Sequence, residues 1–309
     1  MKSNNILVTG GTGCVGQHLQ ELIPCATFIG STDCDLRDKV AVRRLFNNKY
    51  DTVIHLAARV GGIQDNIANP LEFLEDNLVM NTNIVTEAHM AGVSKFIGIG
   101  STCVYPDMLT EYGSYPMCEE VLHDGPPTPT NFGYAYAKRM LATHLKTIRE
   151  SKGLDYFTIF PSNLYSEFDN FENDTKSHFV TALLKKIKNS RGEVLLMGTG
   201  APLRQFIHAN DLAKIIVECL DKKIKTDFNV CDDIDGRPPS IKEIAETALK
   251  ATDNEDYKLI FDNDNMKDGQ YRKDCSNKKM KELFPDFNFI ALDNGLRVVY
   301  NSIKLSVSV

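Results

Sequence analysis

A hydroxyl and a thiol stand two positions apart in the segment GSTCVYP, as Ser101 and Cys103, directly after the apolar run KFIGI. Residues two apart in an extended segment project to the same side, so both side chains can face one ligand from a strand end. Free cysteines are among the most buried residues, and Cys103 taken alone is more typical of a core position. Its chemistry therefore depends on which other reactive groups the fold brings to it.

Tyr134 and Lys138, in the segment NFGYAYAKRM, form a second candidate pair. Their spacing places them on one face of a helix, whereas Tyr136 has no lysine at that spacing. A phenol with a pKa of about 10 is a poor acid or base at neutral pH, but an adjacent ammonium stabilises the phenolate and lowers that pKa. Such a pair is usually a solvated surface pair. Together with a nucleotide-binding turn and a strand-end serine, it instead predicts proton transfer to a substrate.

The glycine-rich turn TGGTGCVG follows the first apolar run. Gly10, Gly13 and Gly16 are evenly spaced, and Gly11, Gly13 and Gly16 match the pattern G-x-G-x-x-G. Because these positions have no side chains, a pyrophosphate can approach backbone N–H groups at the start of the following helix. An ordinary tight turn is the alternative, but a strand before it and a helix after it favour a dinucleotide.

The segment GSTDCDLRD, after the second apolar run, leaves the choice of dinucleotide open. Asp33 lies about 20 residues beyond Gly13, where a carboxylate would bind the ribose of NAD. Ser31, Thr32 and Arg37 are equally placed to receive the 2′-phosphate of NADP.

Short apolar runs alternate with helical patterns in the first half of the chain. The expected strands are NILVTG, ATFIG, DTVIHLAA, KFIGIGS and YFTIFPS, and the expected helices span 14–23, 71–91 and 134–150. Continuous rather than alternating apolar residues indicate strands buried on both faces, hence a parallel sheet with helices on each side. The predicted fold class is α/β, a doubly wound parallel sheet of the Rossmann type with a smaller C-terminal substrate domain.

This alternation breaks after Pro161, at an acidic, Asn-rich loop over 167–177 that precedes the helical segment HFVTALLKKIKN. Apolar strand and helix patterns return at 204–232, which predicts that the chain re-enters the first domain. The expected domains are 1–164 with 205–232 for the dinucleotide, and 165–204 with 233–309 for the nucleotide-sugar.

The composition argues against several classes of partner. The 309 residues carry a formal net charge of −6, which argues against nucleic acid or an acidic membrane surface as the main partner. No apolar run of membrane-spanning length occurs, so the cytoplasm is the expected location. The 8 cysteines include no C-x-x-C pair and no zinc spacing, which predicts reduced thiols and no metal site.

The motifs TGGTGCVG and HLAA, with Ser101 and the Tyr134/Lys138 pair, together resemble the extended short-chain dehydrogenase/reductases. The resemblance narrows to the GDP-L-fucose synthase family, which acts on GDP-4-keto-6-deoxy-D-mannose by 3,5-epimerisation and NADPH-dependent 4-reduction. It continues nearly end to end through HLAARVGGI, GSTCVYPD, NFGYAYAKRM, PSNLY, DNF, SHF, GTGAPLRQFIHANDLA, SIKE, DGQYRK and FPDF. STCVYP and DNF…SHF are the more specific of these motifs.

This resemblance implies roles for five residues. Ser101 would hydrogen-bond the 4-keto oxygen, and Tyr134, beside Lys138, would protonate that oxygen as the nicotinamide delivers hydride. Cys103 and His178 would invert the carbons flanking the ketone, whose protons are acidic because an enolate forms. We assign His178 as base and Cys103 as acid, with the roles exchangeable between the two epimerisations. Without the resemblance, His178 is more typical of a helix start.

The resemblance also implies which residues hold the ligands. NADP(H) is the expected cofactor, with NAD(H) not excluded. Its expected contacts are Gly10, Gly13, Cys14, Val15, Gly16, Asp35, Leu36, Leu56, Ala57, Ala58, Tyr134, Lys138, Pro161, Asn163, Leu164 and His178. The nucleotide-sugar is expected to contact Ser101, Cys103, Asn163, Lys186, Met197, Arg204, Asp268 and Lys273.

Three segments depart from the family pattern. Met197 stands where an aromatic residue is usual, which removes a stacking partner. Ser166 and Glu167 replace Gly-Pro, which adds a negative charge to the loop leading to His178. Thr32 stands where eukaryotic members often have a lysine, and this bears on the preference for NADP.

Two other functions stay open from the sequence. Met197 and Glu167 alter the pocket, so an enzyme acting on a UDP- or dTDP-linked 4-keto-6-deoxy sugar is one alternative. A non-catalytic dinucleotide-sensing protein would keep the fold, but such proteins commonly lose the Tyr/Lys pair that this chain has. The resemblance also implies a homodimer formed through the helices around 71–91 and 134–150.

Overall fold

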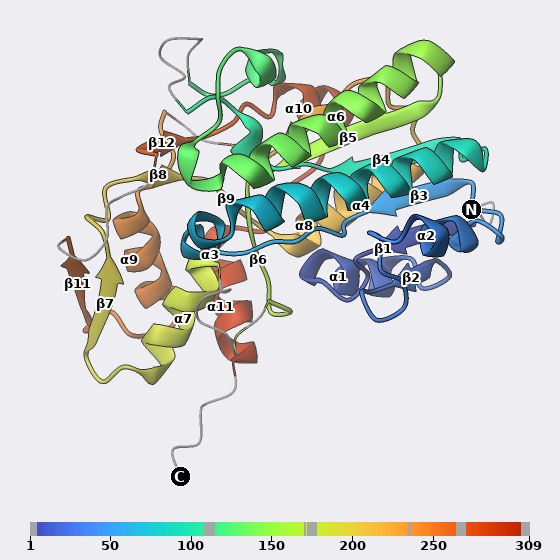
Figure 1. Cartoon of the computed structure of the whole chain (residues 1–309). Coiled ribbons are helices and arrows are strands. Elements are labelled where there is room, and N and C mark those ends of the chain that lie inside the picture. The colour runs from blue at the N-terminus through green and yellow to red at the C-terminus, as the bar shows by residue number, and fades with distance from the viewer. Residues whose placement is uncertain are drawn as a thin grey trace.

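A parallel sheet of six strands forms the centre of the molecule (Figure 1). The computed structural model describes residues 5–107, 115–169, 171, 178–233, 236–263 and 270–303. The strands are β1 (Ile6–Thr9), β2 (Thr27–Ile29), β3 (Thr52–His55), β4 (Lys95–Ile99), β5 (Asp155–Pro161) and β10 (Phe228–Val230). Their order is β10-β5-β4-β3-β1-β2, so the direction of winding reverses between β1 and β3. The predicted doubly wound parallel sheet is confirmed.

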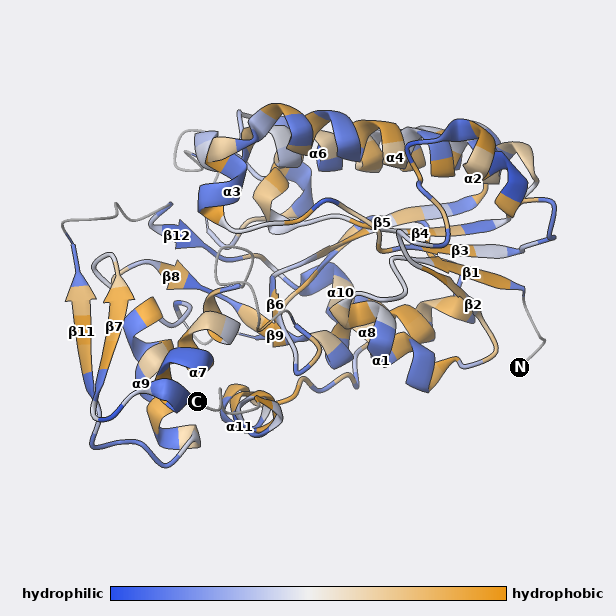
Figure 2. Ribbon diagram, turned by 60° about the horizontal axis from the view of Figure 1, so that its bottom comes forward, coloured by the Kyte–Doolittle hydropathy of each residue, from blue (hydrophilic) through white to orange (hydrophobic). Residues whose placement is uncertain are grey.

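Helices cover both faces of this sheet, as Figure 2 shows. One face is covered by α2 (Lys39–Leu45), α4 (Pro70–Met90) and α6 (Phe132–Lys152), and the other by α1 (Cys14–Leu22), α8 (Ala209–Leu220) and α10 (Lys278–Leu283). Two-sided cover explains why every residue of β1, β3, β4 and β5 is buried. It also explains the continuous apolar runs that predicted these strands.

The helix α6 shows how the spacing of apolar residues determines which face of a helix is buried. Leu141, Leu145 and Ile148 are buried at helical spacing, whereas Met140 on the opposite side is exposed. Gly133, in the first turn, lies so near α4 that a Cβ there would be 2.3 Å from the Pro70 carbonyl oxygen. The start of α6 is therefore packed tightly against the start of α4, which fixes the backbone next to Tyr134.

The second half of the chain builds a smaller unit beside the carboxyl ends of the central strands (Figure 1). Its parallel strand pairs are β7 (Glu193–Met197) with β11 (Lys258–Asp262) and β8 (Leu203–Arg204) with β12 (Arg272–Lys273). Its helices are α7 (Phe179–Asn189), α9 (Ile241–Ala251) and α11 (Leu292–Ser302). The chain returns to the central sheet through α8 and β10. The domain boundaries read from the sequence remain a prediction.

Short elements complete the connections. A separate parallel pair is formed by β6 (Asn163–Tyr165) and β9 (Phe206–His208), between the two halves of the chain. The other short elements are α3 (Ile63–Ala68), η1 (Thr102–Val104), η2 (Glu119–His123) and η3 (Pro129–Asn131). The sequence reading missed α2 and α3. None of the helices in the described part of the chain is long and apolar enough to cross a membrane.

Lys95, the first residue of β4, ties the end of α8 to the sheet. Its Nζ donates to the carbonyl oxygens of Cys219 at 2.5 Å, Leu220 at 2.9 Å and Lys222 at 2.6 Å. The same ammonium lies 3.2 Å from the Asp155 carboxylate. A cation is favoured at a helix carboxyl end, where backbone carbonyls lack partners within the helix.

Replacing Lys95 by Met should therefore lower the free energy of unfolding by about 3–5 kcal/mol, because the buried Asp155 loses its cation. Lys146→Met is the matched control, since Lys146 is 55% exposed and pairs with Glu150 across one helical turn. The control should change stability by less than about 0.5 kcal/mol. Urea unfolding followed by circular dichroism measures both, and equal losses would contradict the argument.

Candidate active site

The glycine turn lies where the strand order reverses, between β1 and β3. Gly10 has a φ of +73°, and a Cβ there would lie 2.7 Å from the backbone nitrogen of Ala57, in the loop after β3. A Cβ on Gly16 would lie 2.5 Å from the Gly11 carbonyl oxygen. Glycine at these positions lets the two loops and the start of α1 come together. Gly13 is the N-cap of α1 and offers no side-chain cap, so the helix N-terminus suits a pyrophosphate.

Most of the predicted cofactor contacts lie at the carboxyl ends of neighbouring strands. Cys14 and Val15 begin α1, Leu56, Ala57 and Ala58 follow β3, Pro161 ends β5, and Asn163 and Leu164 lie in β6. In an open α/β sheet, ligands bind at this edge beside the reversal of strand order. The structure therefore places these residues along one edge of the sheet.

The loop after β2 has its charged groups already paired. The Asp33 carboxylate accepts a hydrogen bond from the Gly30 backbone N–H at 2.7 Å and so closes the turn. Arg37 lies 2.9 Å from Asp35 and 3.1 Å from Asp76. Ser31 and Thr32 are exposed, whereas Leu36, a predicted cofactor contact, is buried in the core. The carboxylate suited to NAD is thus engaged locally, and the hydroxyls suited to a phosphate face solvent.

The segment after β4 turns instead of staying extended, which corrects the prediction made from residue alternation. Residues 102–104 form η1, and Ser101 caps it by accepting a hydrogen bond from the Cys103 backbone N–H at 3.2 Å. Ser101 and Cys103 are therefore brought together by a helix cap, which orders both side chains at the strand end.

Lys273 lies directly against the thiol, with its Nζ 3.0 Å from Cys103 Sγ. Burial alone would raise the pKa of Cys103, but the Lys273 ammonium, hydrogen bonds from Ser101 and Lys273, and the charge of Arg204 lower it below its ordinary value of 9.0. Lys273 is paired with Arg204 across β12 and β8, so two cations face this region. The sequence reading had placed both cations with the nucleotide.

Tyr134 and Lys138 lie at the start of α6, with Lys138 Nζ 5.8 Å from the Tyr134 ring centroid. This ammonium also donates to the Ile99 carbonyl oxygen, at the end of β4, at 2.7 Å. Burial lowers the pKa of Lys138 to about 8. Burial and the nearby Cys103 raise the pKa of Tyr134 above its ordinary value, although a hydrogen bond with Ser101 opposes the rise. The expected lowering of the Tyr134 pKa is absent because desolvation dominates.

His55 and Asn81, which the sequence reading missed, connect the elements that hold this pair. The His55 ring lies 2.7 Å from Thr9 Oγ1 through Nδ1 and 2.9 Å from Asn81 Oδ1 through Nε2. Asn81 donates in turn to the Ala137 carbonyl oxygen of α6 at 3.3 Å. Burial, then the charge of Lys138, lowers the pKa of His55 to about 3, so the ring stays neutral. A single histidine at a strand end gives no sequence signal for such a link.

His178 is the N-cap residue of α7, and its Nδ1 lies 3.2 Å from Asp169 Oδ2. The hydrogen bond and the charge of Asp169 raise the pKa of His178 against the effect of burial, and the charge of Cys103 acts in the same direction. The thiolate charge therefore favours the protonated imidazole. Asp169 was not singled out by the sequence reading, although it belongs to the DNF motif.

The remaining predicted substrate contacts are spread around the strand pairs. Asn163 Nδ2 donates to the Gln205 carbonyl oxygen at 2.8 Å, and Arg204 Nη1 donates to the Leu203 carbonyl oxygen at 2.8 Å. Lys186 reaches from α7 to the Leu195 carbonyl oxygen on β7 at 2.9 Å. Met197 ends β7 and is partly exposed, and Asp268 lies outside the described residues.

Glu167, the extra carboxylate of the loop before His178, is held by two buried imidazoles. Its Oε2 lies 3.1 Å from His208 Nε2 and 3.7 Å from His18 Nε2. Although burial opposes its charge, His208 and His18 hold the pKa of Glu167 at about 2. His208 Nδ1 accepts from the Asn210 backbone N–H at 3.2 Å, so Nε2 is the ring nitrogen that faces Glu167. The three side chains form one polar cluster in which Glu167 is partly exposed and both rings are buried.

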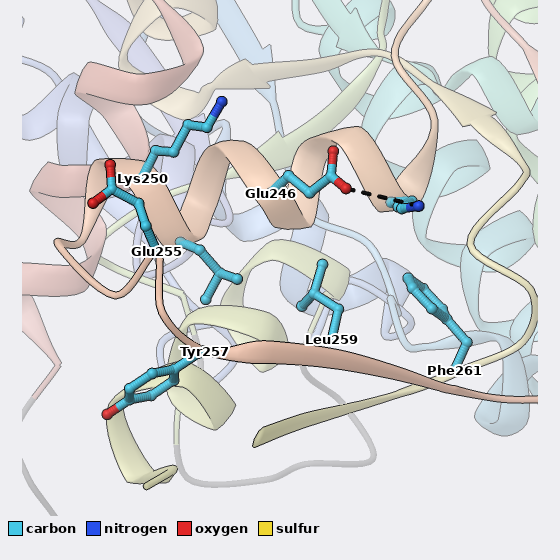
Figure 3. Close-up of a pocket in the computed structure, with 8 residues that line it drawn as sticks. Glu246, Lys250, Glu255, Tyr257, Leu259 and Phe261 are labelled. Atoms are coloured by element: carbon cyan, nitrogen blue, oxygen red, sulfur yellow. Dashed lines mark ion pairs between the residues drawn. The ribbon is translucent and has the colours of Figure 1, made fainter. Parts of the chain in front are cut away.

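A separate groove of about 390 Å³ lies between α9 and β11 (Figure 3). Its lining residues are Lys242, Glu246, Leu249, Lys250, Glu255, Tyr257, Leu259 and Phe261. Figure 3 shows Leu259 and Phe261 facing the helix, with Glu246 and Lys250 along its edge. None of the predicted site residues within the described part of the chain lines this groove.

A doubly wound sheet with a glycine turn at its reversal point defines a nucleotide-binding α/β protein of the Rossmann type. More narrowly, the chain belongs to the NAD dependent epimerase/dehydratase family, whose model matches residues 6–231. The family resemblance read from the sequence is confirmed.

The chain is similar over most of its length to individual proteins of this family. The chain is 36% identical over 304 residues to a GDP-L-fucose synthase of Dictyostelium discoideum, covering 94% of this chain and 92% of that protein. It is 34% identical over 309 residues to a probable GDP-L-fucose synthase of Drosophila melanogaster, covering 94% of each. A GDP-L-fucose synthetase of Naegleria fowleri bound to NADP superposes with a TM-score of 0.86 at 33% identity, covering 98% of this chain and 93% of that one.

Replacing Lys273 by Met should raise the pKa of the Cys103 thiol, because the neighbouring ammonium no longer stabilises the thiolate. Alkylation of Cys103 by iodoacetamide at about pH 7.5 should slow by about tenfold, which corresponds to one pKa unit. Mass spectrometry of the peptide carrying Cys103 measures the rate. Lys186→Met is the matched control, because Lys186 Nζ binds the Leu195 carbonyl instead. An unchanged rate in Lys273→Met would show that the contact does not tune the thiol.

Proposed function

We propose that this chain is a GDP-L-fucose synthase, which inverts carbons 3 and 5 of GDP-4-keto-6-deoxy-D-mannose and then reduces its 4-keto group with NADPH. The names of the relatives support this substrate, and the NADP-bound neighbour supports the cofactor. The observation that carries the proposal is the contact of a partly buried thiol with Lys273, beside Ser101 and the Tyr134/Lys138 pair. One ketone at this place would meet groups for both epimerisation and reduction.

NADPH would be held along the edge formed by the glycine turn and the loop after β3. The backbone N–H groups of the first turn of α1 would bind the pyrophosphate, and Ser31 and Thr32 would face the 2′-phosphate. The exposed hydroxyls of Ser31 and Thr32 support NADPH over NADH, and one oxygen of Asp33 is already engaged by the Gly30 backbone N–H. When bound, the cofactor supplies the hydride. Lys138 would hold the nicotinamide ribose.

The charges around the thiol and imidazole favour Cys103 as the first base and His178 as the first acid, the reverse of the assignment made from the sequence. Lys273 and Arg204 favour the Cys103 thiolate, and Asp169 favours the imidazolium. The thiolate would take the proton from a carbon beside the ketone, and the electron pair would delocalise onto the 4-oxygen. The imidazolium would return a proton to the same carbon from the other face. Each inversion exchanges the protons of the pair, so the next inversion can use the reversed roles.

Reduction would use the phenol as a proton donor. The raised pKa of Tyr134 keeps it protonated at neutral pH, and its hydrogen bond with Ser101 places both hydroxyls at the same site. Ser101 would bind the 4-oxygen, and Tyr134 would protonate that oxygen as the hydride arrives. The partly deprotonated Lys138, with a pKa of about 8, would help to restore the phenol proton.

The function can be tested with GDP-4-keto-6-deoxy-D-mannose and NADPH in D₂O. The wild-type protein should incorporate deuterium at carbons 3 and 5 and form GDP-L-fucose. Cys103→Ser should lose the exchange and yield a 4-reduced, unepimerised sugar. Tyr134→Phe should keep the exchange but slow NADPH oxidation by about 10²-fold, because the acid is lost. NMR of the product and absorbance at the NADPH band measure these outcomes.

Two results would overturn the substrate assignment. A kcat/KM for a UDP- or dTDP-linked keto-sugar as high as that for the GDP-linked one would favour the alternative enzyme. The departures from the family pattern at Met197 and Glu167 are compatible with that alternative. Tight NADPH binding without turnover of any keto-sugar would favour a dinucleotide sensor. A parallel measurement with NADH tests the cofactor preference.

A cytoplasmic homodimer through α4 and α6 belongs to the same proposal. These two helices pack side by side on one face of the sheet, and their outer surface exposes Val79 and Met140, which are 42% and 52% exposed. A hollow of about 350 Å³ between them is lined by Leu78, Asn81, Thr82, Met140, Leu141, Thr143, His144 and Thr147. An apolar surface of this kind suits a second copy of the chain.

Met140→Glu should convert the dimer into a monomer, because a charge would be buried at the centre of that surface. Val40→Glu is the matched control, since Val40 is equally exposed, at 54%, but lies on α2. Light scattering coupled to size-exclusion chromatography gives the mass of each. A monomeric wild type, or a dimer in both variants, would exclude this interface.

A further inference from the structure

Two family motifs that lie apart in the sequence meet in space at His178. Asp169 belongs to DNF and His178 to SHF, and His178 Nδ1 lies 3.2 Å and 3.4 Å from the two carboxylate oxygens of Asp169. A carboxylate only accepts hydrogen bonds, so Nδ1 is the donor and carries a proton. Nε2 is therefore the ring nitrogen that gains and loses a proton.

Asp169 is held in place independently of the histidine. Its Oδ2 accepts from Thr181 Oγ1, in the first turn of α7, at 2.5 Å, and its backbone N–H donates to the Ser166 carbonyl oxygen at 3.2 Å. The Asp169 side chain is only 11% exposed, whereas that of His178 is 44% exposed. A shielded, anchored carboxylate thus supports an imidazole that is open to a ligand.

We propose that Asp169 is the positioning residue of the epimerisation site: its carboxylate fixes the tautomer and orientation of His178, so that Nε2 exchanges protons with the sugar. This inference rests on the proposed epimerase function. The step itself is one proton transfer, in which Nε2–H protonates the carbon of the enolate and leaves a neutral ring. Asp169 keeps its own charge throughout and exchanges no proton.

The charged groups around the pair are consistent with this role. Among the described residues, the Cys103 thiolate also acts on the imidazole, and it favours the same protonated form. Glu167 and Asp169 both act on the Cys14 thiol at the start of α1. Glu167 is occupied by His208 and His18, so Asp169 is the carboxylate that the structure assigns to His178.

A purely structural role is the competing explanation. Asp169 binds the first turn of α7, and a negative charge near a helix N-terminus stabilises the helix. Loss of activity in a variant would then reflect a displaced helix. Two measurements separate these roles: the titration of the His178 imidazole and the pH dependence of deuterium exchange. Removing the carboxylate charge lowers the pKa of His178, whereas a displaced helix does not by itself lower it.

The test compares Asp169→Asn with wild type in two measurements. In the substrate-free protein, the His178 signal in an imidazole NMR spectrum, identified by its loss in His178→Asn, should titrate at lower pH, because the carboxylate that stabilises the imidazolium is gone. With the keto-sugar and NADPH, deuterium exchange at carbons 3 and 5 should fall by about 10- to 100-fold in kcat. The KM should stay within about twofold, and the pH profile of exchange should move to lower pH.

Three further variants complete the design. Asp169→Glu keeps the charge and should restore part of the exchange and of the titration. Thr181→Val removes only the hydroxyl that anchors Asp169, so its effect should be smaller than that of Asp169→Asn. Asp293→Asn is the matched control, because Asp293 is an exposed carboxylate in the first turn of α11 and lies outside the proposed site. It should leave the His178 signal unchanged.

An unchanged His178 titration and an unchanged pH profile in Asp169→Asn would overturn the inference. The failure of the proposed function would look different. In that case the wild type would exchange no deuterium with any keto-sugar, while the substrate-free titration would still show whether Asp169 controls the His178 proton.

Discussion

Burial next to an opposite charge is the interaction on which this site depends. Desolvation disfavours the charged form of every reactive group here, and the groups differ in whether a counter-charge opposes it. Cys103 has Lys273 at 3.0 Å, and His178 has Asp169 at 3.2 Å. Tyr134 has the Lys138 ammonium only at 5.8 Å from its ring centroid among the described residues, and its pKa rises. The counter-charges therefore favour a thiolate and an imidazolium, whereas desolvation keeps the phenol neutral, and these are the forms that the proposed epimerisation and reduction require.

The different charge states of the thiol, the imidazole and the phenol require residues from both halves of the chain. Ser101, Tyr134 and Lys138 come from the central sheet and its covering helix, whereas Lys273 comes from β12 of the smaller unit. The β8–β12 pairing sets Lys273 beside Arg204, and the contact with Cys103 then joins positions far apart in the sequence. The central sheet by itself would supply the reducing groups, but its thiol would lack the cation that lowers its pKa.

Local features of the sequence predicted much of the fold and part of the site. Continuous apolar runs specify strands buried on both faces, and the glycine spacing specifies a turn that admits Ala57 and a pyrophosphate. Contacts between distant segments could not be read in this way. The approach of Lys273 to Cys103 depends on tertiary packing, whereas the turn at η1 and the support of His178 by Asp169 join residues two and nine apart, whose geometry the residue pattern does not specify. The direction of the Tyr134 pKa shift likewise depends on how deeply the phenol is desolvated.

Glu167, which departs from the family pattern, adds a negative charge to the loop before His178, and neighbouring side chains hold that charge in place. Glu167 is two residues from Asp169, and an uncompensated carboxylate there would add negative charge near the start of α1, where a pyrophosphate is expected. His208, at the end of β9, and His18, from α1, lie 3.1 Å and 3.7 Å from that carboxylate. Ser166, the other departure, lies 3.1 Å from the His18 ring and accepts the Phe168 N–H, which shapes the turn before Asp169. The two departures therefore act together to anchor the loop to β9 and α1, and Asp169 is the carboxylate facing His178.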